Sequence, residues 1–366
     1  MRRGLLPLIV VIQAMVWATH AFIYETWTFA PEHGAGFTVN MVFAVLSVSF
    51  VASSVLAFRY TNPPVRTMYK ISAAWMGLLS FFFFAAAAAW IVFGIARVIG
   101  FGVSFRSIVE PLFVLAAALG VAGLVNANWT RITRTIIHLD SLPEIWRGRR
   151  AAVVSDLHLG HVRGRGFLQR IVAMIMREKP DVIFIVGDLF DGTAIDAPRA
   201  AEPLRQLAAT GGVYFVAGNH ELFREDLGFV DAVAQAGVRV LSDEKVEVDG
   251  LQIVGVSYRT AVQRNRFAAA LRDIAIDPRR ASVLLNHAPN HPDVAEAAGV
   301  SLQVSGHTHL GQFVPWTWFA RRVYRQFVYG LSRTGRLQVF TSCGAGTWGP
   351  PLRLGSNPEI VVIEFQ

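Results

Sequence analysis

The segment Ala151-Ala-Val-Val154-Ser-Asp156-Leu-His158 joins a short apolar run to two side chains that can hold a metal ion. Runs of this length, rich in Val, Ile, Leu and Phe and ended by Gly or a polar residue, are typical of buried strands. Later runs end in the same way: Asp181–Val186 before Gly-Asp188, Val213–Ala217 before Gly-Asn219-His220, Ser282–Leu285 before Asn286-His287, and Leu302–Ser305 before Gly-His307-Thr-His309.

These strand ends predict one metal site assembled from separated segments. In open α/β sheets, ligands bind in the crevice at the carboxyl ends of the strands. Each group alone has an ordinary explanation: a lone histidine such as His287 is more often structural, and Asp188 or Asp191 could close a turn or cap a helix. These ordinary explanations would have to hold independently at all five strand ends, and we therefore favour the metal site.

The chemistry of the side chains indicates the kind of ion. A mixture of carboxylate, imidazole and carboxamide suits borderline divalent ions such as manganese, iron, cobalt, nickel or zinc. We expect two such ions, with manganese favoured. Two ions about 3.5–4 Å apart need a bridging carboxylate, and Asp188 is the natural bridge. Asp156 and His158 could face one ion together, whereas His307 and His309 could serve one ion each.

Composition divides the chain into two unlike parts. Residues 1–128 hold seven Lys/Arg and three acidic residues, against 27 and 23 in residues 129–366. The net charge of +8 is shared evenly, so neither part stands out as a nucleic-acid surface. Cys343 is the sole cysteine, which excludes an intrachain disulfide. We therefore expect a membrane domain at 1–128, a linker at 129–150 and a catalytic domain at 151–366.

The first part contains apolar stretches long enough to cross a bilayer, which takes about 20 helical residues. A cleaved signal peptide is the alternative for the first stretch, but further spans follow it. With the N-terminus inside the cell, the loop between the second and third spans, the N-terminus and the segment after the fourth span carry the cations Arg2, Arg3, Arg59, Arg66, Lys70, Arg131 and Arg134. The outer side then holds only Arg97 and Arg106, together with Glu25 and Glu32. This distribution predicts a multi-pass membrane protein whose catalytic domain faces the cytoplasm. The predicted spans are Leu5–Tyr24, Val39–Phe58, Ile71–Phe93 and Ile108–Val125.

The second part alternates strand and helix patterns, which favours an α/β sandwich of two sheets flanked by helices. The fold class is therefore α/β, with four transmembrane helices before the sandwich. The predicted helices are Gly166–Glu178, Arg199–Ala209, Asp226–Ala236, Arg264–Ile274 and Pro292–Ala298.

Taken together, the polar blocks resemble those of the calcineurin-like metallophosphoesterases. The tail Gly344–Ile360 is similar to the branch that includes membrane-associated bacterial phosphoesterases. The resemblance covers nearly all of 150–366 and none of the predicted spans. The matching blocks are Asp156-Leu-His158, Gly187-Asp188-Leu-Phe-Asp191, Gly218-Asn219-His220-Glu221, His287 and Gly306-His307-Thr-His309.

The resemblance implies a role for each matched residue. His220 would lie near the leaving-group oxygen as proton donor or positive charge, and the Asp191 carboxylate would orient it. Asp188 would bridge two ions, one held by Asp156, His158, Asp188 and His309, and the other by Asp188, Asn219, His287 and His307.

The segment 312–334 interleaves aromatic residues with arginines directly after His307 and His309. It predicts either a lid at a lipid–water boundary or a solvated insertion packed on the sandwich. We expect the bilayer and an amphiphilic or nucleotide-linked phosphoester as partners, and no nucleic acid. Some relatives hydrolyse the pyrophosphate of UDP-2,3-diacylglucosamine. The alternatives are a phosphodiesterase or phosphatase acting on soluble substrates, and a membrane-tethered regulatory module with low turnover.

Overall fold

The computed structural model describes residues 5–29 and 36–366, and the chain divides into two units. We call Met1–Val125 with Gly349–Leu352 the helical unit, and Asn126–Trp348 with Arg353–Gln366 the sandwich unit. Arg2, Arg3 and Glu32, on which part of the predicted topology rests, lie outside the described residues.

The helical unit is built from long apolar helices, each of which is long and apolar enough to cross a membrane. At about 1.5 Å rise per residue, the third helix is far longer than the hydrocarbon core requires, and the predicted span Ile71–Phe93 lies inside it. The helices are α1 (Leu5–Thr28), α2 (Phe37–Ala57), α3 (Pro63–Val98) and α4 (Phe105–Asn126).

Polar side chains within these helices bond to neighbouring helices. Gln13 donates to the carbonyl oxygen of Ser47 at 2.8 Å, and the Trp75 indole donates to His20 Nε2 at 2.9 Å. Such hydrogen bonds hold helices together where no water is present to compete. This pattern fits packing within an anchor.

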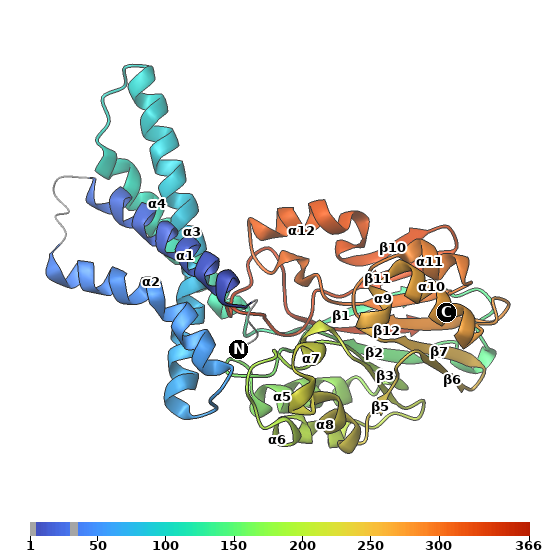
Figure 1. Cartoon of the computed structure of the whole chain (residues 1–366). Helices are drawn as coiled ribbons and strands as arrows, with labels where there is room; N and C mark the ends of the chain where they lie inside the picture. The colour runs from blue at the N-terminus through green and yellow to red at the C-terminus, as the bar shows by residue number, and fades with distance from the viewer. Residues whose placement is uncertain (1–4, 30–35) are drawn as a thin grey trace. The chain divides into compact units, whose positions relative to one another are not determined.

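The sandwich unit contains two six-stranded sheets, in the orders β1-β12-β2-β3-β4-β5 and β10-β11-β9-β8-β7-β6 (Figure 1). Strands β2, β3 and β4 are parallel, as are β8 and β9, so their carboxyl ends point the same way within each sheet. The strands are β1 (Arg131–Ile137), β2 (Arg150–Val154), β3 (Val182–Val186), β4 (Val213–Val216), β5 (Arg239–Val240), β6 (Glu244–Val248), β7 (Leu251–Val256), β8 (Ser282–Asn286), β9 (Leu302–Ser305), β10 (Gly330–Thr334), β11 (Leu337–Thr341) and β12 (Glu359–Phe365).

Three apolar layers hold the sandwich together. Alternate residues of both sheets, such as Phe184 and Val283, meet in a core between the sheets. Helices α5, α6 and α8 pack on the outer face of the first sheet, and α10 and α11 pack on that of the second (Figure 1). The helices of the unit are α5 (Arg165–Arg177), α6 (Ala197–Ala201), α7 (Asn219–Phe223), α8 (Phe229–Gln235), α9 (Tyr258–Ala261), α10 (Arg264–Ile274), α11 (Pro292–Ala297) and α12 (Trp316–Tyr324), with short 3-10 turns η1 (Glu144–Trp146), η2 (Glu202–Gln206), η3 (Glu225–Leu227), η4 (His309–Gly311) and η5 (Arg325–Val328).

Two segments differ from the sequence expectation. The segment 129–150, expected as a linker, contains β1, which pairs in parallel with β12. As the edge strand of its sheet, β1 alternates polar and apolar residues rather than forming an apolar run. The helix expected at Arg199–Ala209 is shorter, because Pro203 follows α6 in a 3-10 turn.

Candidate metal centre

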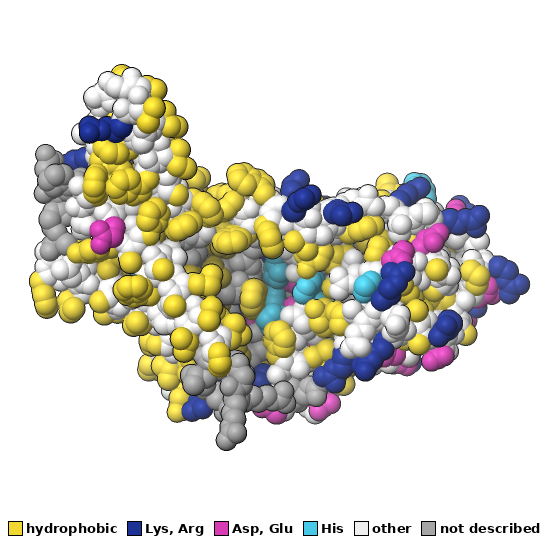
Figure 2. Space-filling view, turned by 45° about the horizontal axis from the view of Figure 1, so that its top comes forward, with side chains coloured by type: hydrophobic (Ala, Val, Ile, Leu, Met, Phe, Trp, Pro, Cys, Tyr) yellow, Lys and Arg dark blue, Asp and Glu magenta, His cyan; other side chains and the backbone are white. Residues whose placement is uncertain are grey.

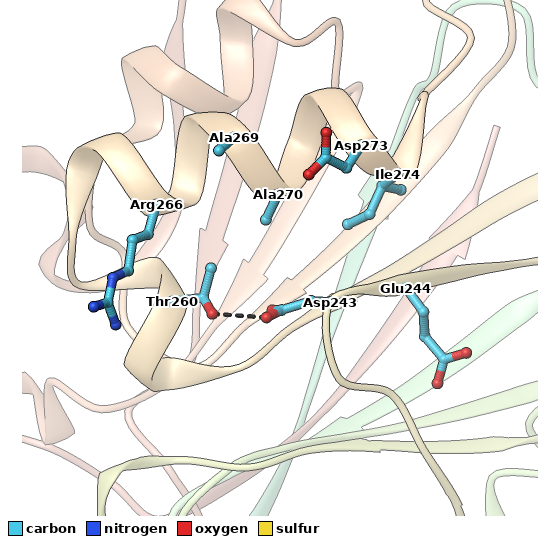
Figure 3. A pocket seen from close by; sticks show the side chains of 8 residues that line it. All are labelled: Asp243, Glu244, Thr260, Arg266, Ala269, Ala270, Asp273 and Ile274. Atoms are coloured by element: carbon cyan, nitrogen blue, oxygen red, sulfur yellow. Dashed lines mark hydrogen bonds between the residues drawn. The ribbon is translucent and has the colours of Figure 1, made fainter.

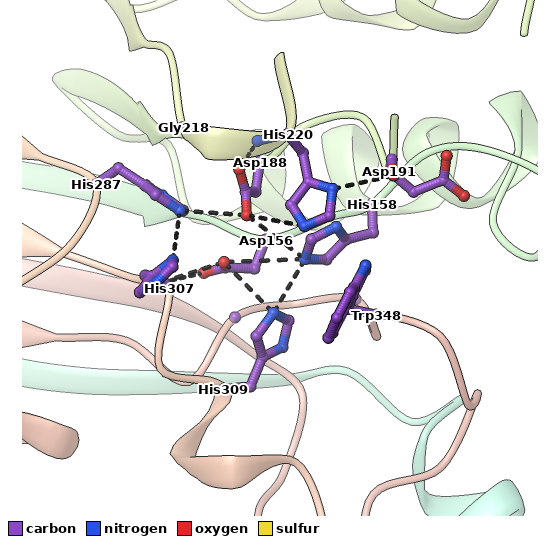
Figure 4. Close-up of polar contacts among 12 residues, drawn as sticks. Asp156, His158, Asp188, Asp191, Gly218, His220, His287, His307, His309 and Trp348 are labelled. Carbon is purple, nitrogen blue, oxygen red and sulfur yellow. Dashed lines mark hydrogen bonds and ion pairs between the residues drawn. The ribbon is translucent and has the colours of Figure 1, made fainter. Parts of the chain in front are cut away.

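The predicted ligands come together at the carboxyl ends of strands from both sheets. Asp156 and His158 follow β2, Asp188 follows β3, and Asn219 begins α7 just after β4. His287 follows β8, and the loop after β9 carries the last two ligands, His307 and His309. Figure 4 shows these histidines and aspartates turned toward one another, and Figure 2 shows histidine side chains gathered in a hollow of the surface.

The side chains form three triads whose ligand atoms lie within 4.8 Å of one another. Asp188 belongs to two of them, as expected of a bridging carboxylate. The triads are Asp156/His158/His309, His158/Asp188/His220 and Asp188/His287/His307.

Several short contacts in the centre join imidazoles to one another or to carboxylates. His158 Nε2 lies 3.0 Å from His309 Nε2, and Asp156 Oδ1 lies 3.5 Å from the same atom. His287 Nε2 lies 3.2 Å from Asp188 Oδ2. Donor atoms converging this closely, mostly from buried side chains, are the arrangement that a bound cation requires.

Asn219 supplies an independent test of whether the donor set fits a metal. Its side-chain oxygen Oδ1 is buried and has no hydrogen-bond partner among the described residues. An orphaned buried oxygen costs roughly 1–3 kcal/mol unless another group satisfies it. A divalent cation beside Asp188 would satisfy it, so the donor set fits the expected metal.

The backbone is strained at most of the predicted ligands. A positive φ is uncommon for residues other than glycine, and it persists at functional sites because the surroundings impose it. The strain marks the positions where the chain must turn sharply past a strand end to aim a side chain at the centre. The angles are +54° at Asp156, +50° at His158, +50° at Asp188, +70° at His307 and +49° at His309.

Gly218 allows two of these segments to approach closely. A Cβ atom at this position would overlap both the carboxylate and the backbone nitrogen of Asp188. Replacing Gly218 would therefore force the strand ends of β3 and β4 apart. The glycine before Asn219 thus has a packing role as well as a place in the motif.

Hydrogen bonds fix the orientation of the rings predicted to bind metal. His287 Nδ1–H donates to the carbonyl oxygen of Val186 at 2.8 Å, which leaves Nε2 free to face Asp188. The guanidinium of Arg353, which is fully buried, donates to His309 Nδ1 at 3.1 Å and to the carbonyl oxygen of His309 at 2.9 Å. Partners of this kind hold metal-binding imidazoles in place.

Glu221 ties the two strand ends around Asp188 together. Its carboxylate accepts hydrogen bonds from the backbone N–H groups of Gly218 at 2.8 Å, Asp188 at 3.0 Å and Phe190 at 3.0 Å. Burial, followed by the negative charge of Asp188, raises the pKa of Glu221 to about 7. The side chain acts as a buried brace between α7 and the loop after β3.

The electrostatics of the centre keep most of its histidines neutral. Burial is the main cause that lowers the pKa values of His158 and His309 well below 6.5 and that of His307 to about 4. Burial opposes charge on His287 too, but the Asp188 carboxylate outweighs it and raises its pKa to about 10. A cation bound beside Asp188 would displace that proton, because metal binding releases protons from its ligands.

His220 and Asp191 meet in a different way from the one the sequence suggested. His220 Nδ1–H donates to the backbone carbonyl oxygen of Asp191 at 3.0 Å. The Asp191 carboxylate instead accepts from the backbone N–H of Thr193 at 2.8 Å and from its hydroxyl at 2.6 Å. Asp191 therefore contacts His220 through its main chain, while Thr193 bonds the carboxylate oxygen Oδ1.

Sequence reasoning gave no role to two residues that support the centre. Glu221 stood in the Gly-Asn-His-Glu block, and Arg353 stood in the tail 344–360. The sequence pointed to them only in that they lie inside blocks that resemble the family. Their contacts are mostly to backbone atoms, and such contacts leave no spacing pattern in the sequence.

Comparison with known proteins agrees with this geometry. Residues 149–311 match the family described as calcineurin-like phosphoesterase. A zebrafish (Danio rerio) protein named "Transmembrane protein with metallophosphoesterase domain" is 34% identical over 71% of this chain, which spans 63% of that protein's length. An uncharacterised metallophosphoesterase of Campylobacter jejuni is 28% identical, with 89% of each chain covered.

Among solved structures, a 5′-nucleotidase precursor from Thermus thermophilus aligns with a TM-score of 0.35 at 16% identity, covering 58% of this chain and 54% of that one. This likeness is too distant to carry a functional argument. The sequence match and the clustered His and Asp ligands lead to one conclusion: the sandwich unit contains a calcineurin-like metallophosphoesterase domain, on a chain whose N-terminal helices are apolar enough to span a membrane.

Proposed function

We propose that this protein hydrolyses phosphodiester or pyrophosphate bonds with two divalent cations, manganese being favoured. The observation that carries the proposal is the position of Asp188, whose carboxylate belongs to two triads of ligand atoms. A shared carboxylate is what two ions about 3.5–4 Å apart need in order to act on one phosphoryl group.

In the proposed reaction, the metals act on the phosphoryl group and His220 acts on the leaving group. When bound, the metals supply an activated water and neutralise charge on the phosphoryl oxygens. His220 presents Nε2 to the centre, 3.9 Å from Asp188 Oδ2, because its Nδ1–H is held by the Asp191 carbonyl. A proton on Nε2 would pass to the leaving-group oxygen. Burial lowers the pKa of His220, whereas the charge of Asp188 opposes that shift.

Hydrolysis is tested with the purified full chain, Mn(II) and bis-p-nitrophenyl phosphate. We expect turnover that a chelator abolishes and that His220→Ala lowers by about a hundredfold or more. Turnover indifferent to the chelator, His220→Ala and Asp188→Ala would overturn the proposal. Metal binding without turnover of any phosphoester would instead favour the tethered regulatory module.

We propose further that the substrate is amphiphilic, and α12 supports this. Its inner face buries Thr317 and Ala320, whereas Trp318 and Phe319 are 69% and 66% exposed. Arg321 and Arg322, which follow in the same helix, are exposed too. Aromatic side chains mixed with cations suit a lipid–water boundary with anionic headgroups.

The same helix reaches the metal centre through its last residue. The Tyr324 ring lies 6.2 Å from that of His307, between ring centroids. A substrate whose apolar part rested on α12 could therefore present its phosphoryl group to the metals. A soluble phosphodiester or phosphomonoester is the alternative, and it would make no use of this surface.

A pair of substitutions separates the two substrate classes. Trp318→Asp with Phe319→Asp should lower turnover of a lipid-linked pyrophosphate in vesicles by about tenfold or more and leave bis-p-nitrophenyl phosphate unaffected. Ile145→Asp, an exposed apolar position in η1, is the matched control. Equal losses on both substrates would end the lipid argument.

We also propose that the chain resides in the bacterial inner membrane with the sandwich unit in the cytoplasm. Arg59, Arg66 and Lys70 between α2 and the middle of α3 support this orientation, and Arg97 and Arg106 oppose it. A reporter enzyme fused to the C-terminus should be active only in its cytoplasmic form. Activity of a periplasmic reporter alone would reverse the topology.

A further inference from the structure

Two exposed aromatic rings contact His220, and the proposed mechanism does not use them. The ring of Phe223 lies 5.0 Å from the imidazole and that of Trp348 lies 5.6 Å away, between centroids, at interplanar angles of 69° and 62°. Phe223 is 63% exposed and Trp348 is 56% exposed. Figure 4 shows Trp348 beside the histidines of the centre. Large rings left this open to water beside a catalytic group are available to a ligand.

Hydrogen bonds with Gln312 hold the backbone of Trp348. The buried side chain of Gln312 accepts from the backbone N–H of Trp348 at 2.9 Å and donates to its carbonyl oxygen at 3.1 Å. Gln312 lies three residues after His309. The loop that carries a metal ligand thus also holds the tryptophan, and the indole remains free to make contacts.

Phe223 is tied to the centre from the other direction. It ends α7, the helix that begins at Asn219 and carries His220. Glu221 of the same helix bonds to the backbone of Asp188. The two rings therefore come from segments far apart in sequence, and each is linked to a metal-binding loop.

We infer that Phe223 and Trp348 form a subsite for a planar aromatic leaving group, either an aryl ring or a nucleobase. The inference rests on the proposed hydrolysis, in which His220 serves the leaving-group oxygen, so that the substituent on this oxygen meets the rings beside His220. Stacking on aromatic side chains is favourable for any planar π system and tolerates different ring identities. The subsite thus selects for shape and not for a hydrogen-bond pattern.

The kinetic test uses methyl phosphodiesters in pairs that differ only in the leaving group. The first pair carries phenol or a fluorinated aliphatic alcohol of matched acidity; the second carries uridine or ribose, linked through the 5′ oxygen. Trp348→Ala and Phe223→Ala should each lower kcat/KM for the aromatic member by about tenfold, and for its partner by less than about twofold. Trp348→Phe should keep most of the preference. A loss in the phenol pair alone identifies an aryl site, and a loss in the uridine pair identifies a nucleobase site.

The matched control is Trp129→Ala, which removes an exposed tryptophan that stacks on Arg131, 5.1 Å from ring centroid to guanidinium carbon. It should leave both preferences unchanged. Equal losses on the aromatic and aliphatic members in the Trp348 and Phe223 variants would overturn the subsite while leaving hydrolysis intact.

A binding measurement keeps the inference independent of turnover. With the Mn-loaded full chain, calorimetry should show phenylphosphonate binding about tenfold more tightly than methylphosphonate, and Trp348→Ala should remove this difference. If the wild type hydrolyses no diester, the proposed function fails and this comparison still decides the subsite. Equal affinities in the wild type would exclude it.

Discussion

Acidic side chains of the sandwich unit gather at the metal centre and in a groove beside α10, and these two groups differ in burial. At the metal centre, Asp156 and Asp188 are almost wholly inaccessible to water. In a groove beside α10, Asp243 is exposed and its carboxylate accepts from the backbone N–H of Ser257 at 2.9 Å and the hydroxyl of Thr260 at 2.7 Å (Figure 3). The groove is lined by Asp243, Glu244, Thr260, Arg266, Ala269, Ala270, Asp273 and Ile274.

The difference separates a structural carboxylate from one available to a ligand. Asp243 holds the start of α9 in place, and water solvates its remaining lone pairs. Asp188 is buried among imidazoles, and the positive charge of His287 outweighs burial to lower its pKa. All three triads of closely spaced ligand atoms in the described part of the chain lie at the metal centre. Grouping of acidic residues alone therefore does not indicate a metal site.

The largest expected effect comes from replacing Asp188 and Asp243 by alanine in separate variants. Asp188→Ala should remove the shared ligand and lower kcat/KM by at least about a hundredfold, with loss of bound metal. Asp243→Ala should keep activity within about twofold and cost about 1 kcal/mol of unfolding free energy, because the Ser257 N–H and the Thr260 hydroxyl lose their acceptor. Metal analysis, kinetics and thermal melts of both variants give the answer. A larger activity loss for Asp243→Ala would contradict the distinction.

A substitution at His220 separates a role in proton transfer from a role in metal binding. His220→Gln should leave the metal content unchanged and lower kcat by about a hundredfold, because proton transfer contributes roughly 10²–10⁴. The loss should grow as the leaving group becomes more basic, since such a group depends more on a proton donor. A plot of log kcat against leaving-group pKa for wild type and variant measures this. Parallel slopes would assign His220 to metal binding instead.

Much of this centre was predictable from the sequence, and the remainder was not, for physical reasons. Asp188 and His287 were expected because strand ends have a recognisable pattern and parallel strands bring their ends together. Strand β1 was not expected, because an edge strand that alternates polar residues resembles a linker. The Asp191 carboxylate was assigned to His220, but a hydroxyl two residues away binds it, and such a local choice leaves no long-range pattern.

A substitution of Arg353 shows how much a residue that hydrogen-bonds to a predicted ligand contributes to stability and metal affinity. Its guanidinium donates to His309 Nδ1 and to the carbonyl oxygens of Cys343 and Gly346 at 2.8 and 2.7 Å. Arg353→Met should cost about 4 kcal/mol of unfolding free energy, because buried carbonyl groups lose their donor. Metal affinity should fall by about 10–100-fold, as is typical when a supporting partner of a ligand is removed.

Denaturant unfolding and metal titration measure the two effects of Arg353→Met separately. Loss of stability with unchanged metal affinity would show that Arg353 supports the fold alone. Arg353→Lys provides the matched variant, since it keeps one charged donor but not the planar geometry that reaches several acceptors.

Asp191 lies between the two cases, since its exposure is intermediate and its carboxylate is hydrogen-bonded to nearby residues like that of Asp243. Burial raises the pKa of Asp191 to about 6, against 3.8 for the free side chain, although Thr193 opposes the shift. The folded protein therefore binds more protons than the unfolded chain between about pH 4 and 6, and stability falls as the pH rises through that window. Asp191→Asn removes this loss without removing the acceptor for Thr193. Its unfolding free energy relative to wild type should rise by up to about 3 kcal/mol from pH 4 to pH 7, as followed by denaturant unfolding. If the difference in unfolding free energy between Asp191→Asn and wild type did not change from pH 4 to pH 7, the charged carboxylate would be as stable at position 191 as in water. Burial would then not distinguish the carboxylates of the centre from those of the groove.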